Sequence, residues 1–168
     1  VEGNKCRFNG SNGLKSEDTL LTLGALRQMG VTIDVTDDKF VVHGAKGTFM
    51  PSTNPIYLGN SGTSMRLLTA VAALGKGGYT LTGTKRMGER PIRDLLDGLT
   101  QIGVKARSVN DNGCPPIEIK GDKVTGGKVD LKCGVSSQFL GESRRYFWIG
   151  AVSASTLWFV SLSLGGQM

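Results

Sequence analysis

Small hydrogen-bonding residues form the stretch LGNSGTSMR at residues 58–66, directly before an apolar run that a glycine closes. The pattern predicts a tight turn that opens into a helix over residues 62–74. The first turn of a helix presents backbone N–H groups without helical partners, and the positive end of the helix dipole favours negative charge. A helix start of this kind could therefore bind a phosphate or a carboxylate. Spacing alone favours a plainer explanation, in which Asn60 or Ser61 caps a core helix.

A second candidate is the basic loop GTKRMGERP at residues 83–91, which ends in Arg90 and Pro91. Proline suits the first position of a helix, and the apolar residues spaced along 92–102 predict that helix. A planar guanidinium can hold a carboxylate or a phosphate with two parallel hydrogen bonds. The alternative for Arg90 is a solvated arginine in a surface loop.

The overall charge also favours anionic ligands, since the 168 residues carry a net charge of +6 and the pI is near 9.4. No basic run interleaves with aromatic residues, so we expect no nucleic-acid partner. The three cysteines lie far apart and His43 is the only histidine, which argues against a zinc site and a histidine-based triad. The odd number of scattered thiols suggests a reducing compartment.

Helical and strand patterns surround both candidates. Ser16 followed by two acidic residues predicts a helix start, and Gly30 ends the leucine stripe that follows. The helix at 62–74 lacks a polar face, so we expect it to be buried on all sides. At most one short strand precedes residue 16. Further strands are expected at 31–35, 39–44, within 49–58, and at 79–82, 104–109, 117–120 and 129–131.

The order of these elements occurs twice. Leu23, Leu26, Gln28, Gly30 and Val31 recur with the same spacing as Leu96, Leu99, Gln101, Gly103 and Val104. Such matches arise easily in any helix–glycine–strand unit, but the element order on both sides favours a true repeat. In that register the start of helix 62–74 corresponds to Ser136-Ser137, a second helix start built from small hydrogen-bonding residues.

Five motifs carry a resemblance to a known family: LGNSGTSMRLLTA, GTKRMGERPIRDLLDGL, NGCPPIEIKG, TGGKVDL and VSSQFL. In this order they resemble 5-enolpyruvylshikimate-3-phosphate synthases, from about Ser16 to Leu140. The runner-up is the related transferase that acts on UDP-N-acetylglucosamine. Its loop before the Arg-Pro helix typically carries a catalytic cysteine, which this sequence lacks.

The resemblance implies an α+β fold of repeated βαβαββ units, with mixed sheets packed on buried parallel helices. Residues 1–75 would be a first, incomplete unit and residues 76–140 a second. Residues 141–168 form an atypical apolar tail that could begin a third unit. Its stretch 146–168 has no charged residue and is long enough for a transmembrane span. Its serines, glycines and threonine make it only weakly hydrophobic, which favours a buried helix or a non-native sequence instead.

The resemblance also implies an activity, the transfer of the enolpyruvyl group of phosphoenolpyruvate to the 5-hydroxyl of shikimate 3-phosphate without metal or cofactor. It implies a place in aromatic amino-acid biosynthesis, in the cytoplasm or in a plant plastid. Phosphoenolpyruvate would be bound by Asn60, Gly62, Thr63, Arg90 and Gln138. Shikimate 3-phosphate would be bound by Ser136, Ser137 and Gln138.

Three departures from the family pattern limit this expectation. The family's N-terminal Gly-Ser-Lys-Ser segment is absent, the C-terminal domain with the acid–base residues is missing, and the pattern breaks after Leu140. We therefore expect a partial enzyme without turnover, whose partner is the missing domain in cis or in trans, and name no catalytic residue. The alternatives are a non-catalytic module that binds phosphorylated metabolites and a membrane-tethered interaction protein.

Overall fold

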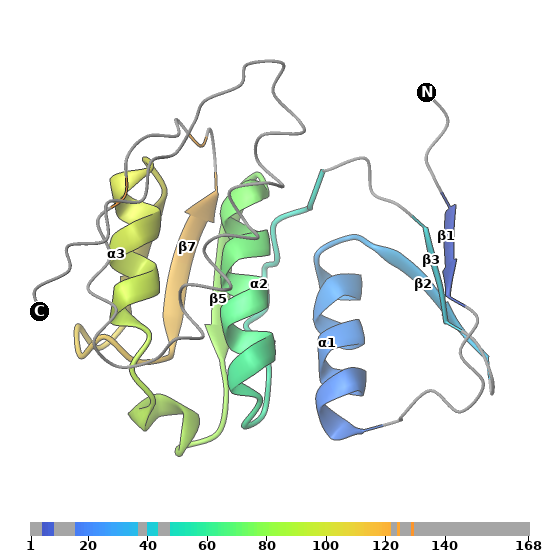
Figure 1. Ribbon diagram of the computed structural model, residues 1–168, viewed down its shortest axis with the longest axis horizontal. Coiled ribbons are helices and arrows are strands. Elements are labelled where there is room, and N and C mark those ends of the chain that lie inside the picture. The colour runs from blue at the N-terminus through green and yellow to red at the C-terminus, as the bar shows by residue number, and fades with distance from the viewer. Residues whose placement is uncertain are drawn as a thin grey trace, which may run out of the picture.

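The computed structural model describes residues 5–8, 16–36, 40–43, 48–121, 124 and 129. Two sheets and three α-helices make up this part of the chain (Figure 1). The α+β class with mixed sheets is confirmed. The predictions for Ser136, Ser137 and Gln138, for residues 130–131 of the expected strand at 129–131 and for the tail at 141–168 lie outside the described residues.

The first sheet has the strand order β1-β3-β2 and is antiparallel. Its strands are β1 (Lys5–Phe8), β2 (Thr32–Val35) and β3 (Phe40–His43), and helix α1 (Glu17–Gln28) precedes β2. The strands predicted at 31–35 and 39–44 and the short N-terminal strand are confirmed. His43, whose side chain is 33% exposed, ends the middle strand of this sheet.

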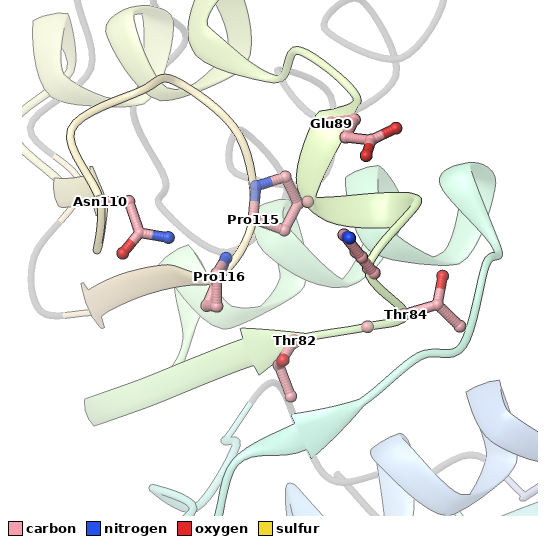
Figure 2. Close-up of a pocket in the computed structure, with 9 residues that line it drawn as sticks. Thr82, Thr84, Glu89, Asn110, Pro115 and Pro116 are labelled. Atoms are coloured by element: carbon pink, nitrogen blue, oxygen red, sulfur yellow. The ribbon is translucent and has the colours of Figure 1, made fainter.

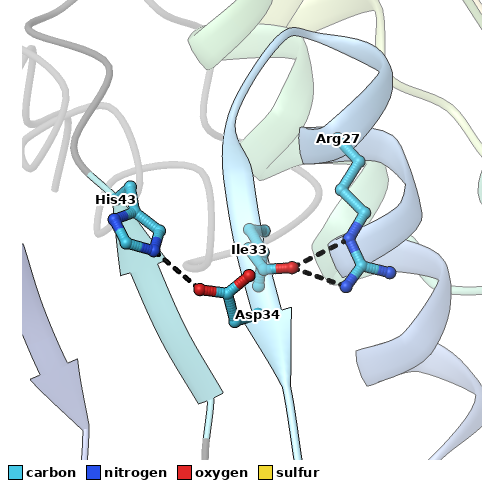
Figure 3. A network of polar contacts seen from close by, with 4 residues as sticks. All are labelled: Arg27, Ile33, Asp34 and His43. Carbon is cyan, nitrogen blue, oxygen red and sulfur yellow. Dashed lines mark hydrogen bonds and ion pairs between the residues drawn. The ribbon is translucent and has the colours of Figure 1, made fainter.

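Polar side chains tie this layer together (Figure 3). Arg27, in the last turn of α1, donates from Nε and Nη2 to the Ile33 carbonyl oxygen of β2, at 3.2 and 2.6 Å. His43 Nε2 lies 2.8 Å from Asp34 Oδ2 across the β2–β3 pair. The His43–Asp34 contact is exposed, so it adds little stability, whereas the bonds from Arg27 are partly buried and join α1 to β2.

The second sheet has the order β4-β5-β7-β6, with β4 and β5 parallel and the other neighbours antiparallel. In chain order its unit reads β4 (Ile56–Tyr57), α2 (Gly62–Leu74), β5 (Gly77–Thr82), the 3₁₀ turn η1 (Met87–Glu89), α3 (Arg93–Gln101), β6 (Lys105–Ser108) and β7 (Ile117–Gly121). This is a βαβαββ unit. It runs across residue 75, where the sequence places a unit boundary, and that boundary stays a prediction.

Helices α1 and α3 end in the same way. The N–H of Val31 donates to the Leu26 carbonyl, and the N–H of Val104 donates to the Leu99 carbonyl, each at 3.0 Å. Gly30 directly precedes Val31 and Gly103 directly precedes Val104, and these two glycines have φ angles of 86° and 90°. Only glycine adopts this left-handed conformation at little cost, and the bonds are those of a Schellman motif. The glycines that punctuate the sequence pattern therefore serve one structural purpose at both positions.

One hydrophobic core joins the two layers, because Ala25 of α1 and Met29, which caps the end of α1, pack with residues of the second sheet and of α2. Helix α2 is buried along most of its length, but Leu67 is 38% exposed. The expectation that α2 is buried on all sides was therefore wrong within the described part of the chain. Among the described residues, no helix has the length and apolar character needed to cross a membrane.

The three helices stand side by side and begin at the same end of the molecule (Figure 1). The β4–α2 turn and η1 also lie at this end. Parallel helix starts bring unpaired N–H groups and the positive ends of the helix dipoles to one face. The fold therefore places the two candidate segments of the sequence together.

Candidate functional site

The glycine turn before α2 is held against the end of strand β5. The Leu58 N–H donates to the Thr82 carbonyl and the Thr84 N–H donates to the Gly59 carbonyl, each at 2.9 Å. Gly59 has a φ of 57°, and a Cβ on Gly83 would collide with the Gly59 carbonyl oxygen. Both glycines are therefore required by backbone geometry, and they fix where α2 begins.

Ser61 caps helix α2, which decides between the two predicted capping residues. Its Oγ accepts from the Ser64 N–H at 3.4 Å. The N–H groups of Gly62 and Thr63 come before it and have no acceptor among the residues that the structure describes. Helix capping and anion binding are therefore compatible here, because the Ser61 cap satisfies one N–H group and leaves two N–H groups for a ligand.

The side chains around these two N–H groups are accessible. Asn60 and Thr63 are exposed, and Gly62 is half-buried. The described residues therefore form an open face at the start of α2 and not an enclosed pocket. An open face of this kind matches one side of a cleft whose opposite side is not formed by the described residues.

Arg90 lies over Gly62. Its Nη1 stands 2.9 Å from the point that a Cβ on Gly62 would occupy. Arg90 is half-buried, and its N–H donates to the Met87 carbonyl at 3.1 Å. Met87 is 1% exposed, so the buried end of η1 anchors the arginine. The structure thus brings together the two segments that the sequence proposed separately.

The β6–β7 turn supports the arginine segment from behind. The Ile92 N–H donates to the Gly113 carbonyl at 2.8 Å, and Arg93 Nη2 donates to the Asp111 carbonyl at 3.2 Å. Gly113 has a φ of 75°, and a Cβ there would stand 2.7 Å from Arg93 Nε. Helix α3 begins at Arg93 with Ile92 as its cap, so the prediction that Pro91 opens the helix was wrong by two positions.

The electrostatic character of this face is positive. Arg90 forms no ion pair with any carboxylate of the described residues, and the exposed Lys85 and Arg86 precede it. The nearby Glu89 is exposed to solvent. A guanidinium next to the positive end of a helix dipole favours an anion, and both lie at the same surface.

The structure also holds a pocket of about 350 Å³ next to this face (Figure 2). None of Asn60, Gly62, Thr63 and Arg90 lines it. Gly83 and Thr84 border both the pocket and the glycine turn, so the β5–η1 segment separates the two features. The pocket is lined by Thr82, Gly83, Thr84, Lys85, Gly88, Glu89, Asn110, Pro115 and Pro116.

Comparisons with known proteins agree with the geometry. A family model for EPSP synthase (3-phosphoshikimate 1-carboxyvinyltransferase) matches residues 8–143. The 3-phosphoshikimate 1-carboxyvinyltransferase of Nitrosomonas europaea is 48% identical over 131 residues, which are 77% of this chain and 30% of that protein. The protein of the same name from Methanothermobacter thermautotrophicus is 43% identical over 127 residues, 76% of this chain and 30% of its own.

A solved structure of EPSP synthase from Acinetobacter baumannii superposes with a TM-score of 0.72 at 29% identity. The match covers 84% of this chain and 32% of that one. The chain therefore spans about 30% of the length of the relatives that it matches.

Proposed function

Since this chain belongs to the EPSP synthase family, we propose that its α2–Arg90 face is one wall of the site where phosphoenolpyruvate reacts with shikimate 3-phosphate. The observation that carries the proposal is the position of the Arg90 guanidinium over Gly62, 2.9 Å from where a Cβ would stand. The enolpyruvyl group would pass to the 5-hydroxyl of shikimate 3-phosphate, and phosphate would leave.

Phosphoenolpyruvate carries a carboxylate and a phosphate, and the face offers donors for such groups. The Arg90 fork can bind two oxygens of one anionic group. The N–H groups of Gly62 and Thr63 can bind a further oxygen at the start of α2. Because Gly62 has no Cβ, the ligand and the guanidinium can both approach the backbone here. Asn60 flanks this position and can donate an amide hydrogen.

These groups also suit the chemistry of the step. A proton would add to the methylene carbon of phosphoenolpyruvate while the 5-hydroxyl oxygen, losing its own proton, adds to the adjacent carbon. When the resulting tetrahedral intermediate loses a methyl proton and expels phosphate, negative charge moves onto the leaving oxygens. Fixed donors that already point at those oxygens stabilise the departing phosphate without having to reorganise. Arg90 and the two backbone N–H groups would supply this stabilisation. Acid–base groups would come from the part of the enzyme that this chain does not contain.

The second substrate would bind next to this wall. Ser136 and Ser137 are proposed to hold the phosphate of shikimate 3-phosphate, and Gln138 to lie between the two substrates. The proposal rests on their motif and on their correspondence with the start of α2. The partner would be the remainder of the enzyme, in cis or in trans, and the location would be the cytoplasm.

Calorimetric titration of the full chain with phosphoenolpyruvate tests the site. We expect measurable binding that Arg90→Gln weakens at least tenfold, because the charged fork is lost. Arg86→Gln is the matched control, since Arg86 is an exposed arginine of the same loop. Equal loss in both variants would mean that general charge attracts the ligand, and the proposed role of Arg90 would fail.

Activity requires the other wall. Mixing the chain with the part of the Nitrosomonas europaea relative that it does not cover should release phosphate from the two substrates together. The chain alone should release none. Release by the chain alone would contradict the proposal that it is one wall of the site.

A second candidate function is a binding module for phosphorylated metabolites without catalysis. The observation in its favour is the open face formed by the exposed Asn60 and Thr63, which can take an anion without a second wall. In that case phosphoenolpyruvate and simple phosphate esters would bind equally well. Mixing with the complementary part of a relative would then yield no phosphate release.

A further inference from the structure

A row of hydroxyl groups links helix α1 to the start of α2. Thr22 Oγ1 lies 2.7 Å from Ser64 Oγ, and Ser64 Oγ lies 2.8 Å from Ser61 Oγ. Ser61 and Ser64 are 4% and 6% exposed, so their hydroxyls have little access to solvent. Thr22 stands 42 residues before Ser64 in the chain. The row therefore connects helix α1 to helix α2 at the edge of the α2–Arg90 face.

The number of hydrogens sets the direction of the row. Each hydroxyl has one hydrogen to donate, and Thr22 Oγ1 donates its hydrogen to the Asp18 carbonyl oxygen at 2.7 Å. Thr22 must then accept from Ser64, and Ser64 must accept from Ser61, if each short contact is a hydrogen bond. The donation runs from Ser61 through Ser64 and Thr22 to Asp18.

This direction has a consequence for the cap. Ser61 gives away its only hydrogen, so its oxygen faces the Ser64 N–H purely as an acceptor, at 3.4 Å. A hydroxyl that donates becomes a better acceptor, which strengthens the capping bond. Ser61 is then unable to donate to an anion. The ligand face is left with the N–H groups of Gly62 and Thr63.

We infer that Thr22 and Ser64 are positioning residues for the anion site, through this one-way row of hydroxyls. They touch no ligand. They hold Ser61 in its capping orientation and so aim the N–H groups of Gly62 and Thr63 outward beneath Arg90. The inference rests on the proposed function for its ligand, phosphoenolpyruvate, but its structural part can be measured without any ligand.

The test uses amide NMR of the full chain. Thr22→Val keeps the shape of the side chain and removes the hydroxyl, whereas Thr22→Ser keeps the hydroxyl. The control is Thr100→Val, because Thr100 Oγ1 donates in the same way to the carbonyl four residues earlier, that of Leu96, at 2.8 Å. Within the described part of the chain, the Thr100 hydroxyl makes no further hydrogen bond. A loss of helix stability alone would therefore appear in both valine variants.

Without ligand, we expect Thr22→Val to shift the amide signals of Gly62, Thr63 and Ser64 and to speed hydrogen exchange at Ser64. Thr22→Ser and Thr100→Val should leave them in place. With phosphoenolpyruvate, we expect Thr22→Val to bind about fivefold more weakly, as the loss of one partly buried hydrogen bond predicts. Thr22→Ser should restore binding to within about twofold.

The outcomes separate the inference from the proposed function. If Thr22→Val leaves the three amides and the Ser64 exchange rate unchanged, the hydroxyl row does not position the turn and the inference is overturned. If the amides respond but the unmodified chain binds no phosphoenolpyruvate, the positioning role stands and the proposed ligand fails. If the amides respond and binding is unaffected by Thr22→Val, the row shapes the turn without serving the site, which also overturns the inference.

Discussion

Arg90 and Gly62 come from different loops, and the Arg90 Nη1 atom stands 2.9 Å from the place of a Gly62 Cβ. The helix start carries the positive end of a dipole, and the guanidinium adds a full charge beside it. Neither group is joined to the other by a protein hydrogen bond in the described part of the chain. The pair therefore converges on a surface position where an anion would meet both.

The first prediction is that Gly62→Ala lowers the affinity for phosphoenolpyruvate about tenfold, or about 1.4 kcal/mol. The new methyl group displaces the end of the Arg90 side chain, which is flexible, so the free energy of unfolding should change little. Calorimetry and urea unfolding measure the two effects. Gly78→Ala is the control, since a Cβ there meets no atom within 4 Å. Equal affinity of both variants would show that the Arg90–Gly62 contact does not matter for binding.

The second prediction is that Gly113→Ala destabilises the protein by about 1–2 kcal/mol, because the left-handed backbone conformation is higher in energy for alanine than for glycine. The residue has a φ of 75°, and its Cβ would press on the Arg93 side chain. Urea unfolding gives the change in free energy. Affinity for phosphoenolpyruvate should fall as well, since the Gly113 carbonyl accepts from Ile92 next to the arginine segment. A stable variant with full affinity would rule out the supporting role of this turn.

The third prediction is that Gly24→Ala stabilises the protein by about 0.5–1 kcal/mol. Gly24 lies inside helix α1, and a Cβ there meets no heavy atom within 4 Å. Alanine loses less backbone entropy than glycine when it enters a helix. A higher urea midpoint with an unchanged slope is expected, and a lower midpoint would mean that the position is more crowded than the structure shows.

The fourth prediction concerns alkaline pH. Burial raises the pKa of Tyr79 above its usual value of 10.0, and its hydroxyl donates to the Phe49 carbonyl at 3.1 Å. The stability that the neutral side chain contributes is complete below pH 10 and is lost as the pH rises through the raised pKa of the folded protein. Unfolding free energies should therefore fall more steeply above pH 10 for the unmodified chain than for Tyr79→Phe.

Urea unfolding at pH 8, 10 and 11 measures this difference. At pH 8 the Tyr79→Phe variant should be less stable by about 1 kcal/mol, because it lacks the hydrogen bond. The gap between the two proteins should narrow above pH 10. Parallel curves over the whole range would mean that Tyr79 ionises equally in the folded and unfolded states.

The sequence by itself determined the local features of the protein. The start of α1 at Ser16, the bounds of α2 at Gly62 and Leu74, and the left-handed glycines after α1 and α3 all follow from residues a few positions apart. Caps and turns are local because their hydrogen bonds close within one or two turns of the chain. The motifs also identified the family to which the chain belongs.

Only the tertiary structure decided which of these features meet. The approach of Arg90 to Gly62, the hydroxyl contact of Thr22 with Ser64, and the support from Gly113 all join segments far apart in the sequence. The exposure of Leu67 is of the same kind. Such contacts depend on how sheets and helices pack, and the period of a helix or strand shows which face is apolar but not what covers it.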